Sequence, residues 1–232
     1  MFVTRPIAEA ALRRLANDAR VDMWDDEMPP PHDHLLAQLK HCDGVLSMVS
    51  DRFDAATIAA APRLAVISNL AVGVDNVDLA AATRAGIPVG HTPGVLTETT
   101  ADLAFALLMA SARRVAEGDR FVRAHRWRAW TPRLMLGRDV WGATLGIIGW
   151  GAIGQAMARR GAAFGMRVLY VSHDHRSPDS KRMAKRRPAT DANGQSIAAP
   201  NAERADLERL LAESDFVSLH VPLTPETRHL IG

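Results

Sequence analysis

The sequence is poor in cysteine and in aromatic residues, and it lacks long apolar runs. Its one cysteine, Cys42, cannot form an internal disulfide, and neither a second thiol nor a cluster of histidines supplies metal-ligand spacing. We therefore expect no metal site and a reducing, cytoplasmic setting. No run is long enough for a membrane helix, and the N-terminus lacks the apolar core of a signal peptide. We therefore expect neither membrane insertion nor export.

A strong excess of one charge is also missing. The 232 residues carry a formal net charge of +2, which is too small to predict a nucleic acid or an anionic membrane as a partner. Five basic residues do cluster between positions 181 and 187, inside a polar segment from Pro178 to Ala205. We interpret that segment as a solvated loop, with a nucleic-acid or localisation role as the alternative. The hydrophobic share of 47% fits one large or two modest globular domains.

What the first 90 residues do contain is a regular alternation of short apolar runs and helical patterns. The apolar runs are Phe2–Thr4, Val21–Trp24, Gly44–Val49, Leu64–Asn69 and Ile87–Gly90, and the helical patterns include Leu12, Leu35–Leu39, Ala55–Ala60 and Leu79–Ala85. Strict alternation of this kind predicts an α/β fold, in which helices wrap a parallel sheet through right-handed crossovers.

A strand, a glycine-rich turn and a helix stand at the centre of the chain. The apolar run Leu145–Ile148 leads into Gly149, Gly151 and Gly154, and a helical pattern follows over Gln155–Phe164. In a GxGxxG turn the glycines allow a tight bend, close approach of the backbone to a pyrophosphate, and close packing of helix on strand. The helix N-terminus then binds the phosphates through its unpaired N–H groups. The pattern predicts a dinucleotide site, with a tight turn in another α/β protein as the alternative.

The residue that reads the adenosine ribose is expected about 20 residues after the glycines, at the end of the next strand, Arg167–Val171. Ser172 occupies that place, where an aspartate or glutamate would favour NAD. Three neighbours could donate to a 2'-phosphate, although Asp174 weakens the positive field. These neighbours are His173, His175 and Arg176. The pattern favours NADP(H) and leaves NAD(H) possible.

The longest helical pattern runs over Thr99–Val115 and is apolar around most of its circumference. We expect it to be buried on most sides, either as a core helix between domains or at a subunit interface. Further along, a helix is expected from Asp206 to Ala212 and a strand over Phe216–Val221. Another helix is expected to start over Glu226–Ile231.

Five stretches resemble, in order, the D-isomer-specific 2-hydroxyacid dehydrogenases, and most closely their glyoxylate and hydroxypyruvate reductase branch. The stretches are FVTRPI, ISNLAVGVDNVDLAAATRAGIPV, HTPGVLTETTADLAFALLMASARR, GATLGIIGWGAIGQAMA and ESDFVSLHVPLTPETRHLIG. The resemblance covers nearly everything except the basic segment. It implies a flavodoxin-like substrate domain over residues 1–98, left incomplete, and a Rossmann nucleotide-binding domain over 99–232. Only the first half of that doubly wound parallel sheet is then encoded.

The resemblance also implies site residues. The backbone amides of Val72 and Gly73 match the turn that holds the substrate carboxylate, as a small nest of N–H donors can, and Val49 matches a position lining the same pocket. Further positions match cofactor contacts: Thr100, Ile153, Val221, Pro222 and Thr227. Ala152 departs from the arginine common at its place, so one contact with the pyrophosphate is expected to be missing.

The activity implied by the resemblance is NAD(P)H-dependent reduction of glyoxylate or hydroxypyruvate, by a homodimer in the intact protein. The family's catalytic arginine, glutamate and histidine match no residue before Gly232, and among the nine histidines we interpret His91 and His220 as structural. We therefore expect no catalytic residue in this chain and no activity of the chain alone. We also expect the strand Leu145–Ile148 to lack a neighbour on one side, which would favour self-association.

Two other functions remain open. The chain could be a non-catalytic fragment that binds nucleotide or dimerises, or it could serve another substrate of the same family, such as 3-phosphoglycerate. The reading frame after Gly232 would separate the first of these from an enzyme.

Overall fold

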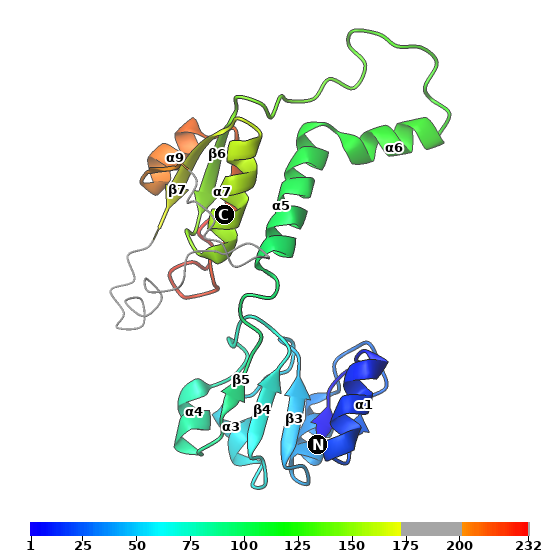
Figure 1. Ribbon diagram of the computed structural model, residues 1–232, viewed down its shortest axis with the longest axis vertical. Coiled ribbons are helices and arrows are strands. Elements are labelled where there is room, and N and C mark those ends of the chain that lie inside the picture. The colour runs from blue at the N-terminus through cyan, green and yellow to red at the C-terminus, as the bar shows by residue number, and fades with distance from the viewer. Residues whose placement is uncertain (173–200, 232) are drawn as a thin grey trace. The chain divides into compact units, whose positions relative to one another are not determined.

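The computed structural model describes residues 1–172 and 201–231 (Figure 1). Contacts between residues divide the chain into unit 1, Met1–Val95, and unit 2, Leu96–Gly232. The sequence places the change of domain three residues later, between residues 98 and 99. Each unit is built on a parallel sheet with flanking helices, so the predicted α/β fold class is confirmed.

Unit 1 contains a five-stranded sheet with the order β2-β1-β3-β4-β5. Its strands are β1 (Phe2–Val3), β2 (Asp22–Met23), β3 (Gly44–Ser47), β4 (Val66–Asn69) and β5 (Val89–Gly90). Its helices are α1 (Glu9–Asp18), α2 (His32–Leu39), α3 (Ala55–Ala59) and α4 (Leu79–Arg84). The alternation of strands and helices is the predicted one, and the strands are shorter than predicted.

The core of unit 1 lies against one row of side chains across its sheet. Phe2, Val45 and Ile67 are direct neighbours in the strand register and are almost completely buried. They belong to one apolar cluster with Leu39 of α2 and Ile58 of α3. Because β1, β3 and β4 run parallel, their carboxyl ends meet at one edge of the sheet. That edge is where ligands of open α/β sheets bind.

Unit 2 contains a four-stranded sheet with the order β8-β7-β6-β9. Its strands are β6 (Thr144–Ile148), β7 (Arg167–Val171), β8 (Glu203–Arg204) and β9 (Phe216–Leu219). Its helices are α5 (Thr97–Ala112), α6 (Val115–Arg123), α7 (Ala152–Ala163) and α9 (Leu207–Glu213). Asp206 caps α9 as predicted, because its carboxylate accepts a hydrogen bond from Arg209 N at 2.8 Å.

Strand β6 is buried on both faces because helices cover both sides of the sheet. Side chains alternate along a strand, so Leu145 and Ile147 pack in a cluster with Met157 of α7, whereas Ile148 packs with Leu210 of α9 (Figure 1). Gly146 also faces α9, since a Cβ atom at this position would lie 2.6 Å from Leu210 Cδ2. The continuous apolar run of β6 is therefore what a strand between two helix layers needs.

Three predictions about unit 2 are wrong. Strand β6 is not an edge strand, because it pairs with β7 on one side and with β9 on the other. Within the described residues, β8 and β9 are the strands that pair on one side only. Part of the segment interpreted as a solvated loop forms β8, which pairs with β7 through Glu203 and Arg204.

The third error is the helix expected to start at Glu226. Residues 225–230 form hydrogen-bonded turns instead. The hydroxyl of Thr227 accepts a hydrogen bond from Thr224 N at 2.8 Å and donates one to Pro222 O at 2.6 Å, and His229 has a φ of 55°. A local side-chain-to-backbone motif of this kind competes with a helix, and a left-handed residue ends the turn.

An ion-pair network fastens β8 to its neighbours. Glu203 of β8 accepts hydrogen bonds from Arg167 of β7 at 2.8 Å, and it lies 2.6 Å from Arg209 of α9. Both arginines also bond to Glu213 at 2.8 Å. These bonds lower the pKa values of both glutamates below their ordinary value. Arginines and glutamates therefore alternate around the network. The polar sequence alone does not indicate this pairing.

Helix α5 is less buried than predicted. One side packs on α7, where the rings of Phe105 and Phe164 lie 4.7 Å apart and Arg160 bonds to Asp102 and, at 3.0 Å, to Glu98. Its other side carries two leucines, Leu103 and Leu107, that are 62% and 61% exposed. Within this chain, burial thus covers one side of α5, and the subunit interface stays a prediction for the other side.

Candidate functional site

The glycine turn joins β6 to α7 at the carboxyl edge of the sheet in unit 2. Gly149 has a φ of 104°, a conformation that favours glycine. Its N–H donates to Val171 O of β7 at 2.9 Å. A Cβ atom at Gly149 would overlap the carbonyl oxygen of His220, and it would lie 2.9 Å from Val221 Cγ1. The turn is therefore wedged between the ends of β7 and β9, where no larger residue fits.

Gly151 and Gly154 serve two other purposes. Gly154 is buried under the turn, and a Cβ atom there would overlap the carbonyl oxygen of Gly149. Gly151 is the N-cap of α7, and a Cβ atom there would meet nothing within 4 Å. No side chain caps this helix N-terminus. The first N–H groups of α7 thus face open space beside Gly151, an arrangement that fits a dinucleotide's phosphates.

An aromatic pair supports the turn, which the sequence reading missed. The ring of Trp150, between the first two glycines, stacks on Tyr170 of β7 with centroids 3.9 Å apart and planes inclined by 19°. Gln155 Nε2 of α7 donates to the carbonyl oxygen of Trp150 at 3.1 Å. The aromatic residue inside the glycine motif was the available signal. Its partner Tyr170 becomes evident only from the register of β6 and β7.

The other predicted cofactor residues of unit 2 fall at several places. Thr100 is exposed in the first turn of α5, while Ala152 and Ile153 begin α7 beside Gly151. Val221 packs in the cluster with Ile148, and its side chain lies against Gly149 in the turn. Pro222 is exposed, and the hydroxyl of Thr227 is used within the turn at residues 222–227.

The end of β7 presents Ser172, half-buried, at the predicted ribose position. The guanidinium of Arg204, from β8, donates to the carbonyl oxygen of Ser172 at 3.4 Å. A cation therefore stands beside this strand end, which sequence reasoning missed because β8 was interpreted as part of a loop. The remaining predicted residues of this group lie outside the described residues: His173, His175 and Arg176.

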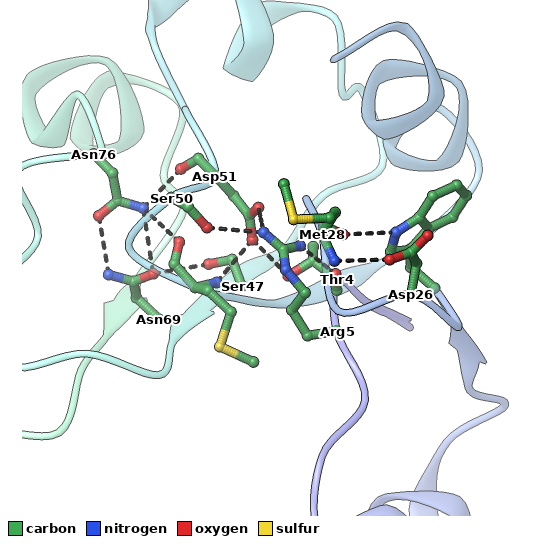
Figure 2. Close-up of polar contacts among 11 residues, drawn as sticks. Thr4, Arg5, Asp26, Met28, Ser47, Ser50, Asp51, Asn69 and Asn76 are labelled. Carbon is green, nitrogen blue, oxygen red and sulfur yellow. Dashed lines mark hydrogen bonds and ion pairs between the residues drawn. The ribbon is translucent and has the colours of Figure 1, made fainter. Parts of the chain in front are cut away.

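The predicted substrate residues lie in unit 1, in the loops that follow β3 and β4. Val49 is 60% exposed in the loop Met48–Asp51, and Val72 is 40% exposed in the loop Leu70–Asn76, with Gly73 beside it. The two loops are tied together by a polar network beneath them (Figure 2). The structure thus brings the loops of the three predicted residues together at the carboxyl edge of the sheet.

Each candidate histidine is hydrogen-bonded through one ring nitrogen. His91 Nδ1 lies 2.9 Å from the carbonyl oxygen of Val72, and His220 Nε2 lies 2.9 Å from Ser218 Oγ. Burial lowers the pKa of His220 below its ordinary value, so this ring is neutral near pH 7. The structural roles of these two residues stay a prediction.

Two searches of the described residues gave negative results. In residues 1–172 and 201–231, no group of three or more His, Cys, Asp or Glu side chains is arranged to hold a metal ion. No helix in the same part of the chain is both long enough and apolar enough to cross a membrane.

Comparison with protein families gives one match over most of unit 2. The model described as D-isomer specific 2-hydroxyacid dehydrogenase, NAD binding domain, matches residues 105–232. Among curated proteins, glyoxylate reductases of Korarchaeum cryptofilum and Pyrococcus horikoshii are 49% and 46% identical to the whole of this chain. The chain covers 65% and 66% of those two proteins, so it spans about two thirds of their length.

Solved structures extend the similarity to both units. The TT0316 protein from Thermus thermophilus is 44% identical, with a TM-score of 0.83 over 99% of this chain and 67% of that chain. A D-lactate dehydrogenase from Aquifex aeolicus, complexed with NAD and lactic acid, is 27% identical with a TM-score of 0.74. That match covers 100% of this chain and 63% of the other.

Substitutions at two glycines separate binding from folding. Gly151→Val should abolish measurable NADPH binding and leave the unfolding temperature nearly unchanged, because the new side chain enters the open space that the phosphates need. Gly154→Ala should instead lower the free energy of unfolding by about 3 kcal/mol, because its methyl group overlaps backbone. Fluorescence titration and thermal denaturation measure the two effects. Unchanged NADPH affinity in Gly151→Val would rule out the phosphate site.

Proposed function

Because the chain belongs to the D-isomer specific 2-hydroxyacid dehydrogenase family, we propose that it serves the NAD(P)H-linked reduction of a small 2-oxo acid to the 2-hydroxy acid. The names of the curated relatives support glyoxylate, and hydroxypyruvate is the second substrate that we propose. The observation that carries the proposal is the uncapped N-terminus of α7 with open space beside Gly151. An uncapped helix N-terminus beside open space is suited to binding a phosphate group.

In this proposal the two units divide the binding. The turn Gly149–Gly154 and the start of α7 hold the cofactor's phosphates, and the cofactor supplies a hydride when bound. The amides of Val72 and Gly73 hold the substrate carboxylate, and Val49 lines the same pocket. Thr100, Ile153, Val221, Pro222 and Thr227 remain proposed cofactor contacts. With Ala152 in place of an arginine, the backbone contributes the greater part of the phosphate binding.

A proton donor is the part of the chemistry that these residues do not supply. Reduction of a 2-oxo acid needs a general acid near the substrate oxygen, with a pKa close to the working pH. His91 and His220 are both hydrogen-bonded within their own units, and the pKa of His220 is lowered. We therefore infer that the 232 residues bind cofactor and 2-oxo acid without turning them over.

The polypeptide encoded by the complete reading frame, whatever its length, provides the test. It should oxidise NADPH in the presence of glyoxylate or hydroxypyruvate, and more slowly with 3-phosphohydroxypyruvate, as followed by absorbance of the reduced cofactor. The 232-residue chain should show no such oxidation. Appreciable turnover by the shorter chain would contradict the inferred lack of an acid. Failure of the complete product with every 2-oxo acid would favour a nucleotide-binding role.

For the cofactor we propose NADP(H) over NAD(H). Ser172 leaves room for a 2'-phosphate where a carboxylate would repel it. Arg204 adds a guanidinium beside the same strand end, through its contact with the Ser172 carbonyl. Arginine is well suited to phosphate because its donors are planar and its charge is permanent.

Cytoplasmic location remains part of the proposal and rests on the single cysteine.

Binding of both cofactors to three variants tests this preference. Wild-type chain should bind NADPH more tightly than NADH, and Arg204→Gln should weaken NADPH binding by about tenfold, the equivalent of one charge-assisted hydrogen bond. NADH binding should stay the same. Ser172→Asp should reverse the preference by adding a carboxylate. Arg209→Gln is the matched control, since Arg209 of α9 pairs with Glu203, the neighbour of Arg204 in β8. Tighter NADH binding by wild type would contradict NADP specificity.

We further propose that α5 mediates a homodimer. Leu103 and Leu107 lie four residues apart on one face of the helix and are largely exposed in the monomer. If these two leucines pack against a second copy of the chain, they bury apolar surface that water otherwise contacts.

Light scattering after gel filtration tests the dimer. Wild-type chain should have the mass of a dimer, and the double substitution Leu103→Glu, Leu107→Glu should give a monomer because two buried charges would face each other. Leu211→Glu, at an exposed leucine of α9, is the control and should remain dimeric. A monomeric wild type would contradict the proposed dimer and would leave the proposed cofactor site untouched.

A further inference from the structure

A buried ion pair lies beneath the loop Met48–Asp51. Arg5 and Asp51 are only 8% and 3% exposed, and Arg5 Nη2 donates to Asp51 Oδ1 at 3.1 Å. The other carboxylate oxygen accepts hydrogen bonds from Met48 N at 2.8 Å and from the hydroxyl of Thr4. Arg5 Nη2 also donates to Ser50 Oγ at 2.8 Å. The end of β1 thus anchors this loop from below (Figure 2).

Two asparagines carry the anchoring across to the loop Leu70–Asn76. Asn76 Nδ2 donates to Asp51 O at 2.8 Å and to Met48 O at 3.1 Å, so one side chain joins both loops. Asn69 Nδ2 donates to Asn76 Oδ1 at 3.0 Å (Figure 2). It also donates to Gly73 O at 3.0 Å. Asn69 is 1% exposed. A polar side chain so deeply buried is held by its hydrogen bonds and has little freedom to move.

The carbonyl groups on both sides of the predicted anion site are held in this way. His91, which follows β5, bonds through Nδ1 to Val72 O, and since a carbonyl can only accept, Nδ1 carries the proton. In a planar trans peptide, the carbonyl of one residue and the N–H of the next point in opposite directions. A fixed Val72 carbonyl therefore fixes the direction of the Gly73 N–H. Asn69 fixes the Gly73 carbonyl and with it the N–H of Val74. The Val72 N–H belongs to the preceding peptide, whose Ala71 carbonyl accepts a hydrogen bond from Thr92 N at 2.8 Å.

We propose that His91 is a positioning residue that aims the amide donor at Gly73, that Asn69 and Asn76 are positioning residues that hold the rest of the loop in register with Val49, and that Arg5 and Asp51 are the anchor. This proposal rests on the proposed function, because it assumes that these amides bind a carboxylate. Amides that are already aimed lose little conformational freedom when an anion binds. A small 2-oxo acid offers few contacts, so its binding depends strongly on this small loss of conformational freedom.

The test uses the 232-residue chain, labelled with ¹⁵N, with oxalate as the anionic probe. In wild type, oxalate should shift the amide resonances of Val72 and Gly73. His91→Leu and Asn69→Ala should weaken oxalate binding roughly five- to tenfold, as expected for the loss of one hydrogen bond. Order parameters of residues 70–76 should fall from about 0.85 to below about 0.6. His91→Asn keeps a donor near the Nδ1 position and should restore both readouts.

A stability-matched control separates positioning from general destabilisation. Asp54→Ala removes the N-cap of α3, where Asp54 Oδ1 accepts from Thr57 N at 2.9 Å, and touches neither loop. It should bind oxalate like wild type. If wild type binds oxalate, and His91→Leu and Asn69→Ala bind it equally well with unchanged order parameters, the positioning role is overturned. If oxalate shifts neither amide in wild type, the substrate site itself fails, while the order parameters still report whether the side chains hold the loop.

Discussion

The contact of α7 with the turn at the end of β6 is the constraint on which unit 2 depends. Gly154 lies directly on the carbonyl oxygen of Gly149, and Gly149 in turn lies against the carbonyl oxygen of His220. Two glycines therefore bring a helix and two strand ends closer than any side chain would permit. The short distance leaves the first N–H groups of α7 at the surface beside Gly151. Packing and the proposed anion binding both follow from one backbone geometry.

Both units meet a negatively charged ligand with backbone amides, according to the proposed function. In unit 2 the donors come from a helix N-terminus, and in unit 1 they come from the loop that contains Val72 and Gly73. Charged side chains act underneath or beside these donors, as Arg5 does below the loop Met48–Asp51 and Arg204 beside Ser172. The small net charge of the chain is therefore compatible with two anion sites.

Much of the fold could be predicted because it follows local patterns. Glycine spacing after a short apolar strand located the turn at Gly149, and the alternation of runs and helices indicated parallel sheets. Pairings between distant segments could not be read in this way. Strand β8 is two polar residues whose order depends on ion pairs with Arg167 and Arg209, and the turn after Pro222 depends on one threonine hydroxyl.

The candidate site divides in the same manner. The glycines and the amide turn have sequence signatures, since each needs a particular residue type at a fixed spacing. The residues that aim the amides have none, because Asn69, Asn76 and His91 are ordinary until β3, β4 and β5 place them at one edge. For helix α5, by contrast, the sequence has a clear signature but does not identify the partner. Its composition indicated apolar contacts on most sides, but composition does not say whether the same chain supplies them.

The stacked pair of Trp150 and Tyr170 places a chromophore of unit 2 inside the proposed phosphate turn. An indole so close to the first N–H groups of α7 is sensitive to any charge that arrives there. The loops Met48–Asp51 and Leu70–Asn76 of unit 1 contain no aromatic side chain. With the other four tryptophans replaced, fluorescence of Trp150 would report on unit 2 while the ¹⁵N-labelled amides of Val72 and Gly73 report on unit 1, so the order in which two ligands bind could be followed.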